Sequence, residues 1–298
     1  MDALQMRPPQ DPQIIEDAKK QDWYVDFDDV NPEAREILET YSGVAQGDVV
    51  QHVKDIVSSP SPRKPSLPVQ ATNHPFQSEN FVYPCIGMVK FLDIEISKTP
   101  CYPEILRRLS SGEHYLEVGC CFGQELRRLL LDGAPATNLH ATDLDLSFAA
   151  LGHLLFRDAH RLPPSTFVAA DILDPAADEL ERQLQGKSSI VSASLFFHLF
   201  DHAQGVAIGK RLVGLLDKSR KGLVVGGQVG GEEYERKSWL GMDLYVHGAE
   251  SFRAMWREIG EATGTTWEVE MREERLVPTS VLESGKRYYM MRFVARQL

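Results

Sequence analysis

A short glycine-containing segment at residues 115–124, YLEVGCCFGQ, is the part of the sequence whose residue types and spacing could do chemistry. Its apolar start predicts a strand and its end begins a helical pattern, so Gly119 and Gly123 lie in the turn between them. Glycine tolerates unusual backbone angles and lets the backbone approach a ligand closely. A turn of this kind after a first strand predicts a ligand site.

Two kinds of glycine loop compete for this segment. A dinucleotide loop would place glycine at 119, 121 and 124, but the sequence has Gly119, Cys121 and Gln124. A loop for the methyl donor S-adenosylmethionine has an acid followed by glycines at alternate positions, which Glu117, Gly119 and Gly123 satisfy. At the strand end, the Glu117 carboxylate can bind the donor's ammonium group directly or through water. The spacing favours the methyl-donor loop over a turn without a ligand.

Two further acids lie at the ends of the next two predicted strands. Asp143 follows Gly123 by about twenty residues, where an acid accepts hydrogen bonds from ribose hydroxyls. Asp171 ends the third strand, facing the adenine amino group, and the amide of Ile172 can reach a ring nitrogen. Each acid alone is commonly a helix cap or a solvated turn. Three acids in this order at consecutive strand ends predict a cofactor site.

The end of the fourth predicted strand offers the remaining chemistry. Ser192 and Ser194 would lie beside the reactive sulfonium, and His198 is a candidate general base or an ordinary histidine at a helix start. His247 is the second candidate base, or a surface histidine. No metal site is expected. The candidate cofactor-binding residues are Glu117, Gly119, Cys121, Gly123, Gln124, Asp143, Leu144, Asp171, Ile172 and Ser194.

Residues 226–231, GGQVGG, resemble a phosphate-binding loop in composition only. They lack the lysine and the Ser or Thr that such a loop uses. We expect a mobile loop near the acceptor pocket at this point.

The elements that must position these residues follow from apolar periodicity. Strands are expected at 114–119, 139–142, 166–170, 190–193, 223–225, 267–271 and 288–295, and helices at 124–131, 148–156, 206–216 and 251–263. Repeated strand–helix units predict an α/β fold of the Rossmann-like kind. Its mostly parallel seven-stranded sheet carries helices on both faces and binds ligands beyond the carboxyl ends of the strands. Residues 109–298 form this predicted domain.

Residues 1–108 are expected to form an N-terminal helical and irregular cap. Asn31 can cap a helix with Pro32 at its first position, and Asp48 can cap a second helix. Prolines at 60, 62, 65, 68 and 75 then predict a loop or an extended arm, before an apolar segment at 83–96 that packs on the main domain. Its aromatic residues are expected to wall an apolar acceptor pocket: Tyr41, Tyr83 and Phe91.

Composition narrows the class of protein. The 298 residues hold 32 Lys and Arg against 43 Asp and Glu, a formal net charge of −11, which disfavours a nucleic-acid substrate. No apolar run approaches the roughly 18 residues that cross a bilayer, and the polar first ten residues lack a signal-peptide core. The four cysteines lack disulfide-framework or zinc spacing. We expect a cytoplasmic enzyme and leave a homodimer open.

Several segments resemble the small fungal methyltransferases of meroterpenoid and polyketide clusters. They span the chain from about residue 36: residues 38–44, 83–87, 119–124 (GCCFGQ), 132–135 (DGAP) and 198–201 (HLFD). The resemblance implies the Rossmann-like class I methyltransferase fold, with S-adenosylmethionine contacts at Glu117, Gly119, Gly123, Asp143 and Asp171. It also implies O-methylation of a hydrophobic secondary metabolite, often at a carboxyl oxygen, and it assigns no catalytic base.

The acceptor decides whether a base is needed. A carboxylic acid with a pKa of about 4 is ionised at neutral pH, whereas a phenol with a pKa of about 10 must lose a proton. We therefore expect carboxyl methylation, with phenolic O-methylation as the alternative that would employ His198 or His247. A methyltransferase-like cyclase, a non-catalytic regulator and an NAD-dependent oxidoreductase are the other classes considered, the last weakened by Cys121 and Gln124.

Overall fold

The computed structural model describes residues 27–57, 89–174, 176, 179–239, 242–276 and 285–298. The proline-rich stretch, Tyr83 and Cys85 lie outside these residues. For them, the expectations from sequence stay predictions.

The predicted seven-stranded sheet is confirmed. The strands are β1 (Tyr115–Val118), β2 (Leu139–Asp143), β3 (Phe167–Ala169), β4 (Ile190–Ser192), β5 (Leu223–Gly231), β8 (Trp267–Arg275) and β9 (Tyr288–Gln297). Their order is β3-β2-β1-β4-β5-β9-β8, parallel from β3 to β5, with β9 antiparallel to both of its neighbours. The strand order reverses between β1 and β4, which is where ligands bind in open α/β sheets.

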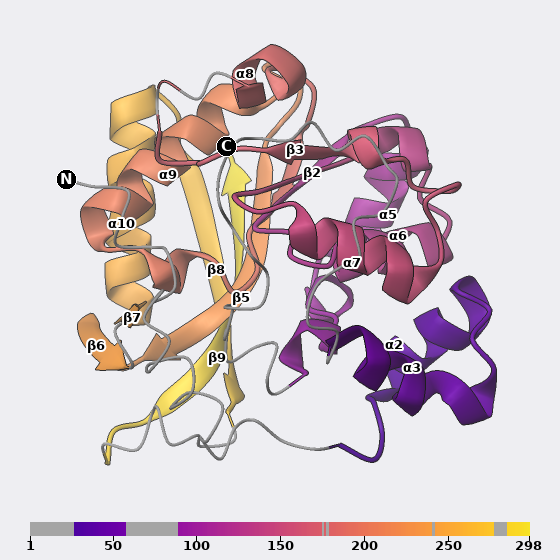
Figure 1. Ribbon diagram of the computed structural model, residues 1–298. Helices are drawn as coiled ribbons and strands as arrows, with labels where there is room; N and C mark the ends of the chain where they lie inside the picture. The colour runs from indigo at the N-terminus through magenta and orange to yellow at the C-terminus, as the bar shows by residue number, and fades with distance from the viewer. Residues whose placement is uncertain (1–26, 58–88, 175, 177–178, 240–241, 277–284) are drawn as a thin grey trace.

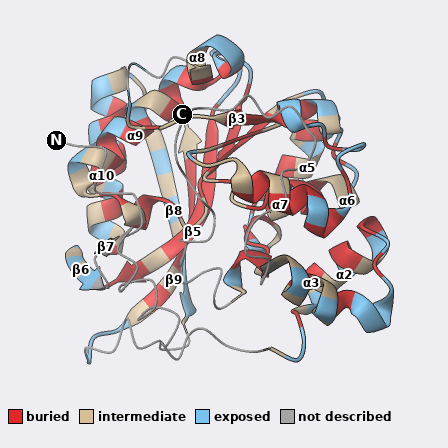
Figure 2. Cartoon of the chain, viewed as in Figure 1, coloured by how far each residue is buried: buried red, intermediate tan, exposed pale blue. Residues whose placement is uncertain are grey.

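Helices cover both faces of this sheet (Figure 1). The covering helices are α5 (Tyr102–Ser110), α6 (Gln124–Leu131), α7 (Ser147–Phe156), α8 (Glu179–Leu184), α9 (His202–Leu215) and α10 (Ala249–Thr263). The N-terminal helices α2 (Pro32–Glu36) and α3 (Val49–Val57) lie outside these layers, where α3 packs on α7. Strand residues alternate between two apolar cores: Tyr115 joins the one beneath α5, α6 and α7, and Leu116 the one beneath α8, α9 and α10. Figure 2 shows the strands between them largely buried.

Two helix starts follow from local chemistry. The side chain of Asn31 accepts a hydrogen bond from the Ala34 amide at 2.9 Å, with Pro32 at the first helical position, as predicted. Asp201 and Gln204 form a capping box at the start of α9, which therefore begins four residues before the predicted position 206.

The expectation of a mobile loop at residues 226–231 is wrong. These residues belong to β5 and pair with β9 through Gly231. Glycine is needed because neighbouring groups crowd the strand: a Cβ on Gly226 would lie 2.5 Å from the Ala193 carbonyl oxygen, and one on Gly230 would lie 2.7 Å from the Tyr289 ring. The paired strands β6 (Glu235–Trp239) and β7 (Met242–Val246), which follow β5, were not predicted.

The N-terminal residues share one apolar core with the sheet. Tyr41 is buried and its hydroxyl donates to Asp158 Oδ2 at 2.8 Å, while the ring of Phe91 stacks on Phe122 with centroids 4.3 Å apart. Both aromatic side chains therefore fix the cap to the main domain. The predicted boundary at residue 108 falls inside α5.

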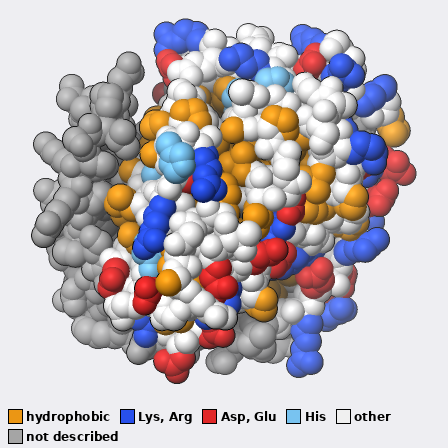
Figure 3. All heavy atoms as spheres, turned by 90° about the vertical axis from the view of Figure 1, so that its right-hand side faces the viewer, with side chains coloured by type: hydrophobic (Ala, Val, Ile, Leu, Met, Phe, Trp, Pro, Cys, Tyr) orange, Lys and Arg blue, Asp and Glu red, His pale blue; other side chains and the backbone are white. Residues whose placement is uncertain are grey.

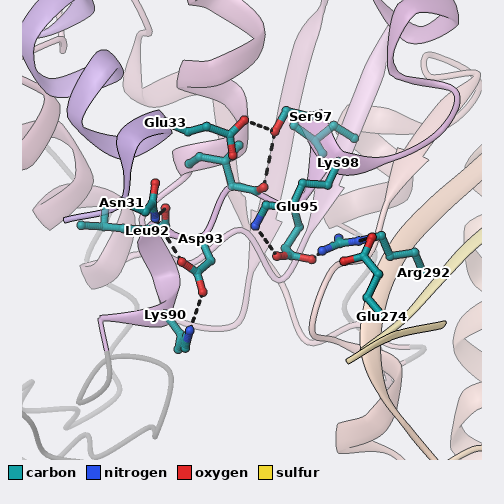
Figure 4. Close-up of polar contacts among 12 residues, drawn as sticks. Asn31, Glu33, Lys90, Leu92, Asp93, Glu95, Ser97, Lys98, Glu274 and Arg292 are labelled. Carbon is teal, nitrogen blue, oxygen red and sulfur yellow. Dashed lines mark hydrogen bonds and ion pairs between the residues drawn. The ribbon is translucent and has the colours of Figure 1, made fainter. Parts of the chain in front are cut away.

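Polar contacts fasten the same N-terminal part at several points (Figure 4). The buried Glu95 carboxylate pairs with Arg292 of β9. Asn31 Nδ2 donates to the Leu92 carbonyl at 2.7 Å, and Ser97 Oγ donates to Glu33 Oε1 at 2.7 Å. These contacts join α2, the segment before α5 and strand β9.

The surface carrying the N-terminal helices mixes charges of both signs with apolar side chains (Figure 3). The net acidity of the chain is therefore not gathered into one patch on that face. None of the helices in the described part of the chain combines the length and apolar character that a membrane crossing requires.

A matched pair of glycines tests how closely α7 packs on the loop after β1. A Cβ on Gly152 would lie 2.1 Å from the Phe122 carbonyl oxygen, whereas a Cβ on Gly214 of α9 meets nothing within 4 Å. Gly152→Ala should lower the free energy of unfolding by about 1 to 3 kcal/mol, because backbone must shift. Gly214→Ala should raise it by up to about 1 kcal/mol through helix propensity. Chemical denaturation measures both, and equal effects of the two substitutions would contradict this packing.

Candidate active site

The loop after β1 takes unusual backbone angles at three positions. Gly119 has a φ of 69°, Cys121 of 49° and Gly123 of 67°. Cys121 therefore occupies a left-handed conformation that costs a non-glycine residue energy, as its place in the predicted pattern implied. Gly123 is the N-cap of α6, so the loop turns directly into the helix and leaves amide groups near its start.

Asp143 at the end of β2 holds this loop in place. Its Oδ2 accepts a hydrogen bond from the Cys121 amide at 2.8 Å, and its Oδ1 accepts one from the Asp145 amide at 3.3 Å. Burial raises the pKa of the Asp143 carboxyl to about 6. A carboxylate has about four lone-pair positions, so acceptor capacity remains for ribose hydroxyls. Leu144, the next candidate, is 48% exposed beside it.

Arg127 supports the loop from below and was not among the predicted residues. Its fully buried guanidinium donates to both oxygens of Asp158, at 2.8 and 2.9 Å, and to the carbonyls of Phe122 and Gly123, at 2.9 and 3.1 Å. The only local signal was that Arg127 falls next to the apolar positions Leu126 and Leu129.

Glu117 lies beneath the loop with an unused acceptor. Its side chain is 4% exposed and its Oε2 has no hydrogen-bond partner. Burial, reinforced by the charge of Glu125, raises the pKa of Glu117 well above its usual value. Gln124 Oε1 is also buried without a partner. Buried acceptors without donors are costly, and a bound ligand that carries an ammonium group would satisfy them.

Glu125 contrasts with Glu117 on the neighbouring helix. Its two carboxylate oxygens accept the backbone amides of Glu95 at 2.9 Å and Ile96 at 2.8 Å. Burial raises the pKa of Glu125 to about 7. This carboxylate is occupied by the N-terminal segment, so Glu117 is the acid with acceptor capacity to offer a ligand.

Asp171 and Ile172 form the turn after β3, beside Asp143. The Ala170 amide donates to the Asp143 carbonyl at 3.0 Å, which brings the two strand ends together. Asp171 Oδ1 accepts the Leu173 amide at 2.9 Å, and the Asp171 carbonyl accepts from Arg211 at 2.9 Å. The turn is thus fixed by its own polar contacts at the predicted edge of the sheet.

The end of β4 lies next to the same edge. Ser192 pairs in register with Glu117 of β1, and its hydroxyl lies 3.5 Å from that of Ser194. Leu195 follows with a φ of 50° and donates its amide to the Gly227 carbonyl at 2.6 Å. The structure therefore places all of the predicted cofactor-binding residues at or just after the carboxyl ends of four neighbouring strands, β3, β2, β1 and β4.

The two histidines lie along the end of β5. The Val229 amide donates to His198 Nδ1 at 3.4 Å, and His247 forms an isolated bridge with Gly230. His247 is 1% exposed, so the expectation of a surface histidine is wrong. Burial lowers the pKa of each imidazole to about 4, with the neighbouring His202 adding to the effect at His247.

Gln228 lies in β5 beside Val229, the residue that contacts His198. The sequence analysis did not identify Gln228 as a site residue because glycines surround it. It is fully buried, and neither its amide nitrogen nor its amide oxygen has a partner. Across the part of the chain with described coordinates, no group of three or more His, Cys, Asp or Glu side chains is placed to hold a metal ion.

Comparison with known proteins identifies relatives over nearly the whole chain. Residues 23–59 match the family model of the meroterpenoid methyltransferase N-terminal domain. The chain is 37% identical over 274 residues to the asnovolin E/chermesin D methyltransferase nvfJ of Aspergillus novofumigatus (strain IBT 16806), with 91% of each chain covered.

Two further relatives are named O-methyltransferases. The chain is 38% identical over 242 residues to phiE of Fungal sp. (strain ATCC 74256), covering 80% of this chain and 74% of the relative. It is 36% identical over 273 residues to atr3 of Stereocaulon alpinum, covering 90% and 73%. The chain belongs to the family of fungal meroterpenoid methyltransferases and is an S-adenosylmethionine-dependent enzyme with the class I fold.

Proposed function

We propose that this enzyme O-methylates a carboxylate of a small hydrophobic polyketide or meroterpenoid intermediate. The observation that carries this proposal is the state of the two histidines, because neither is suited to remove a proton from a phenol. Transfer to oxygen is supported by the two relatives that are named O-methyltransferases, phiE and atr3.

The residues at the ends of the strands each bind a different part of the cofactor in this proposal. Glu117 binds the ammonium group with its unpartnered Oε2, Asp143 accepts from the ribose hydroxyls, and the turn at Asp171 and Ile172 borders the adenine. When bound, S-adenosylmethionine supplies an activated methyl group on a cationic sulfur. The chain's own contribution is to orient this donor and the acceptor in line and to exclude water, which can supply roughly 7 to 11 kcal/mol.

His198 is a hydrogen-bond donor in this arrangement. Its pKa of about 4 keeps the ring neutral at pH 7, and Nδ1 accepts the Val229 amide, which leaves the ring proton on Nε2. Moving a proton from a phenol with a pKa of about 10 to a base with a pKa of about 4 is uphill by about 8 kcal/mol. A carboxylate needs no such transfer and accepts hydrogen bonds from a neutral donor.

The acceptor is proposed to lie beyond the ends of β4 and β5, with part of the N-terminal cap as its cover. Tyr41 and Phe91 are buried against the main domain, so the apolar wall of this pocket must come from other residues. The matched family model, the meroterpenoid methyltransferase N-terminal domain, supports an acceptor of this chemical class.

Asp143→Asn tests the cofactor site. Loss of a charged hydrogen bond worth about 1.5 to 3 kcal/mol should weaken binding of S-adenosylmethionine and S-adenosylhomocysteine about 10- to 100-fold at pH 7.5. Burial holds the pKa of Asp143 near 6 in the unliganded enzyme, and the hydroxyls of a bound ligand favour its ionised form. The affinity of the native enzyme for both ligands should therefore fall as the pH drops through 6. Calorimetry from pH 7.5 to 5 measures both effects.

The control for this experiment is Asp145→Asn, which should keep the affinity at pH 7.5. Because the Asp145 charge helps to raise the pKa of Asp143, its removal should move the pH dependence to lower pH without abolishing it. The Asp145 side chain accepts the Ser147 amide at 2.8 Å, a role that asparagine can also fill. Unchanged affinity for both ligands in Asp143→Asn would remove Asp143 from the site.

His198→Asn and His247→Asn test the absence of a general base. Each asparagine keeps an acceptor near the position of Nδ1, so the fold should survive. We expect kcat to fall less than about tenfold, against the roughly 10²- to 10⁴-fold typical of losing a general base. Steady-state kinetics with circular dichroism as a folding control measures this, and a collapse of kcat in a folded His198→Asn would favour a phenol acceptor.

Product analysis tests the reaction itself. The enzyme is incubated with methyl-labelled S-adenosylmethionine and candidate polyketide acids, and the product is treated with mild alkali. A methyl ester releases labelled methanol, accompanied by one S-adenosylhomocysteine for each ester formed. Label retained on a phenolic oxygen or on carbon, or conversion of the acceptor without S-adenosylhomocysteine, would contradict the proposal.

A further inference from the structure

We infer that Phe196 is a cofactor-binding residue whose aromatic ring faces the positively charged sulfur, so that the site prefers the charged donor over its neutral product. The inference concerns the cofactor alone and is independent of which acceptor atom is methylated. The sequence patterns did not single out Phe196, because it lies in an apolar run, LFFHLF at residues 195–200, that is typical of buried structure.

Contact with the glycine loop places this ring. A Cβ built on Gly119 would lie 2.6 Å from Phe196 Cδ2 and 3.1 Å from Cε2, so the ring packs directly on the Gly119 backbone. Gly119 is the first glycine of the loop that the cofactor must approach. Any ligand that lies along this loop therefore meets the Phe196 ring beside Gly119.

Backbone strain holds the ring there. Leu195 has a φ of 50°, an unusual conformation for a bulky residue, and its amide is tied to the Gly227 carbonyl at 2.6 Å. Cys121, in the facing loop, has a φ of 49°. Strain of this kind persists where the surrounding structure enforces it, commonly at ligand sites. Here the strained residues lie in the loops after β1 and β4, which touch where Phe196 packs on Gly119.

The surroundings suit an interaction between a cation and an aromatic ring. Phe196 is 9% exposed, and Phe200 packs beside it with ring centroids 4.9 Å apart. A weakly hydrated cation within about 6 Å of an aromatic face is stabilised most strongly where water is excluded. The sulfonium of S-adenosylmethionine is such a cation, and the thioether of S-adenosylhomocysteine is not.

Phe197 provides a matched comparison in the same segment. Both residues belong to the core beneath α8, α9 and α10, but Phe197 is fully buried there whereas Phe196 is 9% exposed. The ring neighbours of Phe197 include the buried residues Phe252, Trp256 and Phe293. Its substitution should cost packing without changing the discrimination between ligands.

The experiment measures dissociation constants by calorimetry for three ligands: S-adenosylmethionine, its stable amine analogue sinefungin, which is also positively charged, and neutral S-adenosylhomocysteine. Phe196→Leu keeps an apolar side chain and removes the ring. It should weaken binding of the two cations about 2- to 30-fold while the affinity for S-adenosylhomocysteine changes less than twofold. Phe196→Tyr should retain native discrimination, since it keeps an aromatic face.

Phe197→Leu is the control. It should lower Tm but leave unchanged the ratio of the affinities for S-adenosylmethionine and S-adenosylhomocysteine. If Phe196→Leu weakens S-adenosylmethionine and S-adenosylhomocysteine equally, the ring acts only through packing and the inference is overturned. Unchanged affinities for all three ligands would overturn it as well.

Discussion

The buried ion pair between the Arg127 guanidinium and the Asp158 carboxylate is the interaction on which the rest of the site depends. Burying a charge costs several kcal/mol unless it is paired and its donors are satisfied. Asp158 supplies a two-point contact, and the carbonyls of Phe122 and Gly123 take further donors. Burial acts to raise the Asp158 pKa, but hydrogen bonds from His153 and Arg127 hold it at about 2, so the pair stays ionised at neutral pH. The strained loop after β1 is therefore shaped before any cofactor binds.

The same ion pair connects the N-terminal cap to the cofactor loop. Tyr41 donates to Asp158, and Glu125, two residues before Arg127, accepts the amides of Glu95 and Ile96. A shared apolar core reinforces these contacts. One set of polar contacts thus fixes both the cap, which we propose lies over the acceptor, and the loop, which we propose binds the donor. This arrangement fits a reaction in which alignment of two substrates, rather than proton transfer, carries the catalysis.

Local patterns predicted the sheet and the positions of the acids at the strand ends, because both depend on short-range signals. Apolar runs ending in glycine or aspartate located β1, β2 and β3, and helix α6 matches its expected bounds of 124 and 131. The contacts between residues far apart in the sequence were not predicted. Asp158 lies 31 residues from Arg127, and the glycines at 226–231 form a strand only because β9 packs against them. Phe196 gains its place from contact with Gly119, which its own sequence neighbourhood does not reveal.

A crystal structure of the chain with S-adenosylhomocysteine tests the central claim most directly, namely that a preformed loop and three strand-end acids bind the cofactor. The account predicts the ligand's ammonium group within about 3 Å of the Glu117 carboxylate, its ribose hydroxyls on Asp143, and little movement of the loop that Arg127 supports. A ligand bound elsewhere, with Glu117 Oε2 still lacking a donor, would contradict it.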